Sequence, residues 1–184
     1  NQDFAGNQLG PPGHATLGTF NSALAGGDIF RWLFNSFIFT SSSVVISTLL
    51  AAACAYPLSL MRWRPGKWLL TILIALMVIP PIVLIIPLFQ MMADIKQLNT
   101  YQSVIVIYTG MMLPFSTFLL VSFFGTIPRS LLEAARMDGA KSWSTFVRVV
   151  LPLSLPAIIT VIVVQALWVW NEVLIAVVFL QSDS

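Results

Sequence analysis

The sequence predicts an all-α fold, a polytopic bundle of transmembrane helices, and two observations lead to this prediction. Hydrophobic residues make up 58% of the chain and charged residues only 9%, with a mean hydropathy of +0.89. Soluble domains usually carry about a quarter of charged residues. Four stretches are also almost free of charge, and each exceeds the roughly 20 residues that cross a hydrocarbon core. The expected spans are 31–61, 68–93, 101–125 and 156–180.

The first expected span, 31–61, combines apolar side chains with small and polar ones. Its small residues, such as Ala51 and Ala55, favour close helix contacts, and its hydroxyl residues are too polar for lipid. One face should therefore pack inside a bundle. Tyr56 and Pro57, near the inner end, should kink or end the helix, because proline lacks the backbone donor that a helix needs.

The second expected span, 68–93, contains Pro80, Pro81 and Pro87 and must therefore be bent. A bilayer tolerates the freed carbonyl groups only where other helices, side chains or water satisfy them. The bend therefore indicates a bundle interior or a solute pathway, although a kink needed only for packing explains the prolines equally well. The third span carries Pro114 and Ser116 near its middle, a second place where backbone or hydroxyl groups would face a water-filled path.

The basic residues set the expected orientation. Seven of the nine lie in two groups: Arg62, Arg64, Lys67, Arg129, Arg136, Lys141 and Arg148. By the positive-inside rule, the loop 62–67 and the polar segment 126–155 then face the cytoplasm. The segments expected outside are 1–30, 94–100 and 181–184. We expect one domain that lacks the outer helices of a longer protein. The segment that begins at Asn1 has neither the basic start nor the apolar core of a signal peptide.

One long polar island, 126–155, interrupts the apolar sequence. Pro128 suits the first position of a helix, and Ser130 and Glu133 have the spacing of a capping box. Gly139 suits the left-handed residue that closes a helix. A second short helix from about Ser142 to Val150 should follow, before Pro152 interrupts it, with an apolar face. The residues expected on that face are Trp143, Phe146, Val147 and Val150.

The island reads Glu-Ala-Ala, two residues, Asp-Gly-Ala, then Phe146 and Leu151-Pro152 with a further Pro156. This pattern closely resembles the coupling loop, or EAA loop, of the inner-membrane permease subunits of bacterial ABC importers. The resemblance implies a type I permease fold with a bent cytoplasmic coupling helix that docks on a cytoplasmic ATPase subunit. By position, the coupling role falls on Glu133, Ala134, Ala135, Asp138, Gly139 and Ala140. The plainer alternative is an amphipathic connector whose charges are only a solvated face.

The resemblance also implies partners and a location. They are a second, non-identical permease subunit, two copies of the ATPase subunit, an extracytoplasmic solute-binding protein and the lipid of the bacterial inner membrane. No nucleic acid, metal or cofactor is expected for this chain. Gly66-Lys67 lacks the other residues of a phosphate-binding loop, so ATP and Mg²⁺ should be bound by the partner and this chain should not be an enzyme.

Polar residues in the last span are candidates for a translocation path: Gln165, Trp168, Asn171 and Glu172. Gln165 and Glu172 are seven residues apart and share a helix face with Trp168. An intramembrane carboxylate costs about 2.5–3.5 kcal/mol and needs a partner or an aqueous cavity. Aromatic rings beside amide and carboxylate acceptors are typical of a sugar site. The alternative is an interfacial tryptophan belt with a structural Asn-Glu pair.

The triplet Trp170-Asn171-Glu172 and the segments Leu98–Tyr101 and Leu113–Phe115 resemble the carbohydrate, or maltose-type, branch of the permeases. The function expected is therefore a permease for a sugar or related solute. Permeases for peptides, amino acids or polyamines share the coupling loop and remain an alternative. A secondary transporter is a weaker one, because Glu172 has no charged counterpart in a related repeat.

Overall fold

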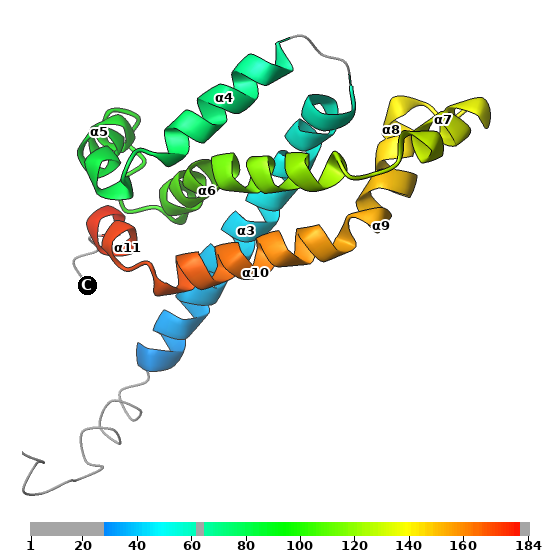
Figure 1. Cartoon of the computed structure of the whole chain (residues 1–184). Helices are drawn as coiled ribbons and strands as arrows, with labels where there is room; N and C mark the ends of the chain where they lie inside the picture. Colours follow the sequence, from blue (N-terminus) through cyan, green and yellow to red (C-terminus); the bar gives the residue numbers. More distant parts are fainter. Residues whose placement is uncertain (1–27, 62–64, 181–184) are drawn as a thin grey trace, which may run out of the picture. The chain divides into compact units, whose positions relative to one another are not determined.

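The computed structural model describes residues 28–61 and 65–180, and these residues are helical with no strand among them. The expected end segment 181–184, most of 1–30 and the core of the loop 62–67 lie outside the described residues. The chain forms two compact units, residues 1–36 and 37–184. The described part of the first unit is the beginning of α3 (Asp28–Leu60), where Phe30 and Phe34 are exposed. The second unit contains all other elements (Figure 1).

From Phe37 onward, α3 packs through small and hydroxyl residues, as the sequence predicted. Ala51, Ala55 and Ser43 are fully buried, and the Ser43 hydroxyl donates to the Ile105 carbonyl oxygen of α6 (Tyr101–Phe124) over 3.5 Å. Pro57 does not end α3, which continues to Leu60.

The helix α6 begins as its sequence dictates. The hydroxyl of Thr100 accepts from the Ser103 backbone N–H, and the Ser103 hydroxyl donates back to the Thr100 carbonyl oxygen. The first of these bonds satisfies one of the N–H groups that a helix start leaves without a partner. The helix then continues through Pro114 to Phe124.

The expected second span is two helices, α4 (Gly66–Met77) and α5 (Pro81–Asp94), bent by 102° at the break between them. Pro80 has an extended backbone and Pro81 is the first residue of α5, where its missing N–H leaves no gap in the helix. The sequence predicted the bend. Its size makes the pair either a broken span or a re-entrant loop.

The expected fourth span, 156–180, is also divided. The helix α10 (Leu155–Asn171) ends at Asn171, and α11 (Leu174–Phe179) follows after Glu172 and Val173. The division falls where Glu172 takes an extended backbone and its carboxylate accepts from the first N–H groups of a new helix, as described below.

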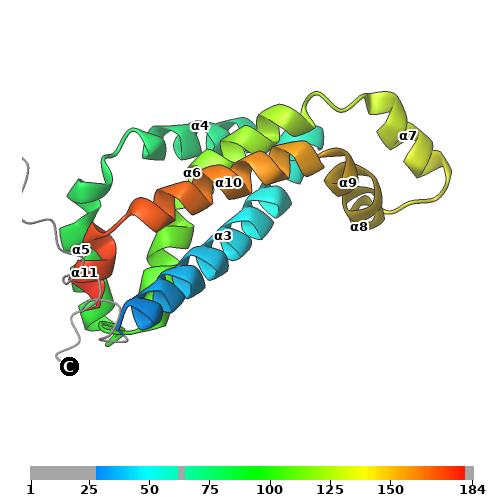
Figure 2. The same ribbon diagram turned by 90° about the horizontal axis from the view of Figure 1, so that it is seen from below.

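The helices α6 and α10 pack along a seam of buried residues that recur every four positions. On α6 they are Tyr108, Met112, Ser116, Leu120 and Phe124; on α10 they are Ala157, Val161, Gln165 and Val169. The order is antiparallel, because Ser116 meets Gln165 while Leu120 and Phe124 share one cluster with Val161 and Ala157. Residues four apart form a ridge on a helix, so two such ridges interdigitate here. Figure 2 shows the two helices side by side.

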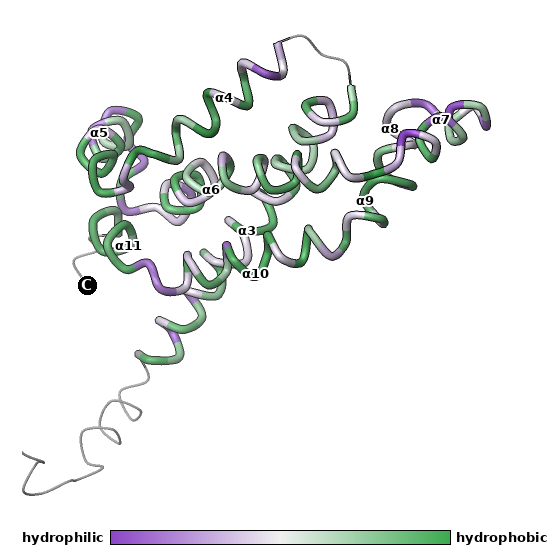
Figure 3. Tube along the Cα trace, viewed as in Figure 1, coloured by the Kyte–Doolittle hydropathy of each residue, from purple (hydrophilic) through white to green (hydrophobic). Residues whose placement is uncertain are grey.

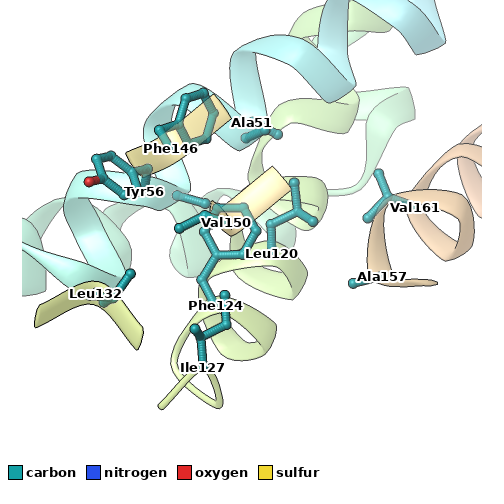
Figure 4. Packing of buried hydrophobic residues seen from close by; sticks show 12 residues of the cluster. Ala51, Tyr56, Leu120, Phe124, Ile127, Leu132, Phe146, Val150, Ala157 and Val161 are labelled. Atoms are coloured by element: carbon teal, nitrogen blue, oxygen red, sulfur yellow. The ribbon is translucent and has the colours of Figure 1, made fainter. Parts of the chain in front are cut away.

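Two apolar clusters occupy opposite ends of α6. The first joins α6, α10 and the end of α3 to the polar island, and Figure 4 shows its residues meeting around Phe124 and Val150. Its ring contacts include Tyr56 with Phe146, whose centroids are 5.0 Å apart. The second cluster joins α5 and α11 to the start of α6, and the rings of Phe89 and Phe179 lie 5.9 Å apart in it.

Two helices are long and apolar enough to cross a membrane, Ile29–Leu60 and Tyr101–Phe124, among the described residues. Two bent pairs also qualify if each is counted as one span: Gly66–Met77 with Pro81–Asp94, and Ser142–Leu153 with Leu155–Asn171. Figure 3 shows hydrophobic colour along α4 and α10, while hydrophilic residues gather in the polar island and near the end of α10. These two hydrophilic places are the ones from which a site can be built.

Candidate functional site

The first half of the polar island is α7 (Arg129–Met137). The helix starts where the sequence predicted, but not by a capping box: Pro128 occupies the capping position, and no side chain caps the helix start. Ser130 is the second residue of the helix, two positions after the cap, and the residue that caps a helix must precede its first turn.

Gly139 ends α7 in the predicted way, with a φ of 78°. The Ala140 N–H donates to the Ala135 carbonyl oxygen and the Gly139 N–H to that of Arg136, which together form a Schellman motif. The bend between the two island helices is therefore set by backbone hydrogen bonds. Asp138 and Gly139 are exposed at this bend.

We expect Gly139→Ala to destabilise the bend by about 1–2 kcal/mol, because a side chain disfavours the left-handed backbone. Crowding is not the cause, since a Cβ atom would meet nothing within 4 Å. Gly110→Ala is the matched control: its Cβ also meets nothing within 4 Å, but Gly110 lies inside α6, where alanine stabilises a helix. Thermal unfolding of the full-length protein should rank the two variants in opposite directions, and equal midpoints would contradict the strain.

The second half of the island runs through α8 (Ser142–Thr145), a π-helical turn (Phe146–Val150) and α9 (Leu151–Leu153). Pro152 does not interrupt it. The Leu151 N–H donates to the Phe146 carbonyl oxygen, five residues back, and the break comes at Ser154. Of the four residues expected on one apolar face, Phe146 and Val150 are buried, whereas Trp143 and Val147 are exposed.

A cavity of about 870 Å³ lies between α7 and the end of α3. Leu60 and Leu132 give it an apolar wall, while Arg129, Glu133 and Arg136 bring charged groups to it. Of the six residues assigned to coupling, Glu133 is the one that lines this cavity. Ala134, Ala135, Asp138, Gly139 and Ala140 are exposed or half-buried on the same bent helix pair. The arrangement offers a charged and partly apolar surface to a protein partner.

The second hydrophilic place begins with Gln165 on α10. Gln165 is 2% exposed, and its amide nitrogen donates to the Ser116 hydroxyl oxygen of α6. Ser116 in turn donates to the Met112 carbonyl oxygen at 2.9 Å. The Gln165 amide oxygen is buried without a hydrogen-bond partner in the described part of the chain. Gln165 therefore joins two helices and keeps one free acceptor.

Gln165 and Trp168 line a cavity of about 600 Å³ formed by α4, α5, α6 and α10. The rest of its wall is mostly apolar and includes Met111, Pro114 and Phe115. Trp168 packs edge-on against the Tyr108 ring, with centroids 6.1 Å apart. Asn171 and Glu172 are not among the lining residues, so the structure brings only two of the four path candidates to this cavity.

Asn171 and Glu172 lie at the break between α10 and α11. The exposed Asn171 amide donates to the Leu167 carbonyl oxygen at 2.6 Å. The Glu172 carboxylate accepts from the Leu174 N–H at 3.1 Å and from the Ile175 N–H at 2.9 Å, so it caps the start of α11. The Tyr108 hydroxyl donates to the same carboxylate at 3.0 Å. Tyr108 therefore supplies the hydrogen-bond partner expected from the sequence for an acid inside the membrane.

Sequence reasoning did not single out Tyr108, and it proposed a water-facing role for Ser116, which is fully buried. The four-residue recurrence of Tyr108, Met112, Ser116, Leu120 and Phe124 was a signal that could have found both. This recurrence was hard to recognise in the sequence, because the buried face and the lipid-facing side of an apolar helix do not differ in hydropathy.

An all-α membrane protein with a polar, bent helix pair at one end and hydrophilic groups at helix breaks is typical of the membrane component of a transporter. The chain belongs to the family of binding-protein-dependent transport system inner membrane components, whose model matches residues 43–183. The resemblance that rested on the coupling motif is thus confirmed.

Curated relatives have the same character. The chain is 35% identical to the alpha-glucoside transport system permease protein AglG of Rhizobium meliloti, over 94% of this chain and 47% of that protein. It is 32% identical to the melibiose/raffinose/stachyose import permease protein MelC of Bacillus subtilis, over 94% of this chain and 63% of that protein. The chain thus spans about half to two thirds of the length of these relatives.

A solved structure also resembles this one. It is the crystal structure of a bacterial ABC transporter involved in the import of the acidic polysaccharide alginate, with a TM-score of 0.73 and 30% identity. The match covers 80% of this chain and 51% of that one. The all-α membrane permease fold is therefore confirmed, and the family places this chain among transport components in a membrane.

Proposed function

We propose that this chain is part of the permease subunit of an ABC importer that carries a sugar or related solute across the bacterial inner membrane. The observation that carries the proposal is the bent helix pair 129–153, whose exposed charged groups lie beside a cavity at the end of α3. A subunit that performs no covalent chemistry needs a rigid external handle through which a partner can move it. The pair has the required rigidity, because a Schellman motif and an apolar cluster fix it.

The partner at this handle would be a cytoplasmic ATPase subunit, present in two copies and holding the ATP and Mg²⁺. Glu133, Arg129 and Arg136 would meet it through charge, and the exposed Trp143 through apolar contact. ATP binding then favours one arrangement of the membrane helices through the difference in contact energy between the two states. The coupling role of Glu133, Ala134, Ala135, Asp138, Gly139 and Ala140 is part of this proposal.

A second, non-identical permease subunit would complete the translocation path, and an extracytoplasmic binding protein would deliver the solute. We place Gln165, Trp168, Asn171 and Glu172 along this path. An amide and an aromatic ring that line one cavity, those of Gln165 and Trp168, suit a hydroxyl-bearing solute with an apolar ring face. The names of the relatives, which include alpha-glucoside and melibiose/raffinose/stachyose permeases, support a carbohydrate.

The test is reconstitution of the full-length permease with its ATPase and binding protein in proteoliposomes. Uptake of labelled oligosaccharides and stimulation of ATP hydrolysis by the loaded binding protein are measured together. Stimulation by a sugar-loaded binding protein supports the proposal. Stimulation only by a peptide-loaded or amino-acid-loaded binding protein would show that the solute is not a sugar. Uptake driven by an ion gradient without ATP would overturn the ATP-driven mechanism.

We expect Trp168→Ala to raise the solute concentration for half-maximal uptake about tenfold, because truncation of a tryptophan at a binding site often costs 2 kcal/mol or more. Trp170→Ala is the matched control, since Trp170 lies two residues further on α10 and does not line the cavity. Equal effects of the two variants on uptake would contradict a role of Trp168 in the path and would favour an interfacial tryptophan belt.

A further inference from the structure

The break between α10 and α11 is held by one carboxylate with three donors. The Glu172 side chain accepts from two backbone N–H groups of α11 and from the Tyr108 hydroxyl of α6. Tyr108 is 1% exposed and lies in the apolar cluster that joins α5, α6 and α11. Hydrogen bonds to a charged group in a site of low dielectric are stronger than neutral ones in water.

We propose that Tyr108 and Glu172 form a positioning pair that fixes α11 to α6 and keeps α10 broken at Glu172. The Glu172 carboxylate acts on the transport path through this break and not by contact with the solute. The pair acts on transport only if the proposed permease function holds, but its effect on the order of α11 is independent of that function.

The geometry favours positioning over solute contact. Both carboxylate oxygens are engaged: Oε1 accepts from Leu174, and Oε2 accepts from Ile175 and Tyr108. A solute hydroxyl at this carboxylate would compete with donors that the fold supplies. A backbone hydrogen bond also ties the other end of α11 to the start of α6: the N–H of Asn99, just before α6, donates to the Phe179 carbonyl oxygen.

The break at Glu172 determines which helices can move together. The helix α11 is short, and the helical hydrogen-bond pattern is interrupted between Asn171 and Leu174. We therefore expect that α10 can tilt while α11 stays packed on α5 and α6. The path candidates Trp168 and Asn171 lie on the α10 side of the break, and Trp168 contacts the same Tyr108 ring edge-on. The pair therefore fixes the break and the place of α11, whereas Trp168 contacts the ring of Tyr108 and not its hydroxyl group.

Three variants separate the hydrogen bond from Tyr108 to Glu172 from the two bonds that Glu172 accepts from the backbone of α11. Tyr108→Phe removes only the hydroxyl and leaves the cap of α11. Glu172→Asp keeps a carboxylate near the start of α11 but is one methylene too short for Tyr108. The double variant Tyr108→Phe with Glu172→Asp tests whether the two changes remove the same interaction. Tyr56→Phe is the matched control, because Tyr56 is another buried tyrosine, on α3, outside this cluster.

The measurement is hydrogen–deuterium exchange of the peptide over 173–180 in the full-length permease complex, held in lipid nanodiscs. Loss of the bond should raise the exchange rate about tenfold in each single variant. The double variant should add little to either, and Tyr56→Phe should leave the rate unchanged. Unaltered exchange in Tyr108→Phe, or additive effects in the double variant, would overturn the pair.

Uptake kinetics of the same variants distinguish positioning from contact. A positioning pair lowers the maximal rate in Tyr108→Phe and Glu172→Asp alike and leaves the half-maximal solute concentration unchanged. If Glu172 binds solute directly, Glu172→Asp raises that concentration while Tyr108→Phe does not, and the positioning role in transport is overturned. If the wild-type complex transports no carbohydrate, the proposed function fails and the exchange experiment still decides the pair.

Discussion

Replacement of Glu133 by alanine is expected to reduce solute-stimulated ATP hydrolysis by at least about tenfold. Glu133 is exposed on α7 and lines the cavity at the end of α3 together with Arg129 and Arg136. Removal of one charged partner at a buried interface commonly costs about 2–5 kcal/mol, much of it from the opposite charge left without its partner. The reduced stimulation should therefore appear together with weaker association of the permease and its ATPase.

The matched control for Glu133→Ala is Ser130→Ala, which alters an exposed residue of the same helix outside the cavity lining. Co-purification and ATP hydrolysis are measured for both variants, with thermal unfolding to show that the membrane part remains folded. Undiminished association and stimulation in Glu133→Ala would mean that the island is only an amphipathic connector between helices.

Replacement of Phe124 by alanine is expected to destabilise the folded protein by about 3–5 kcal/mol. Phe124 is fully buried near the end of α6, in the cluster that joins α3, α7, α10 and the π-helical turn. The substitution removes the ring around which the cluster of Figure 4 packs, where the bent helix pair 129–153 meets α6. It should therefore loosen α7 against α6 as well as lower the unfolding temperature.

Phe118→Ala provides the control for Phe124→Ala, because Phe118 lies on the same helix but is 40% exposed. Thermal unfolding of the two purified full-length variants in the same detergent checks the prediction. A similar midpoint for both would show that the cluster around Phe124 relaxes to fill the cavity, and that the rigid connection to the coupling helices does not depend on it.

The polar island 126–155 shows how much local sequence patterns can predict. The start of α7 after Pro128 and the left-handed backbone of Gly139 were predicted correctly, because both follow from the chemistry of single residues. The fate of Pro152 was not. A proline that interrupts an α-helical hydrogen-bond pattern is accommodated here beside a π-helical turn, and the packing of Phe146 and Val150 favours this solution.

The path candidates show the opposite limit. The spacing of Gln165, Trp168 and Glu172 predicted one shared helix face. Gln165 and Trp168 do line one cavity, whereas Glu172 lies at the break after α10 and does not line it. The spacing gave no indication of Ser116 and Tyr108 as the partners of Gln165 and Glu172, since these lie 49 and 64 residues away in the chain. Pairing across such a distance depends on the register of α6 against α10.

The sequence by itself determined that this is an all-α membrane protein of the importer permease family, because composition, charge distribution and the motif 133–140 are local properties of the chain. Only the tertiary structure decided that the last span breaks at Glu172 and which polar groups meet. The physical reason is that a carboxylate or amide in an apolar environment must find a donor or acceptor, and several are available along neighbouring helices. Packing selects among them, and here it selected Tyr108 for Glu172 and Ser116 for Gln165.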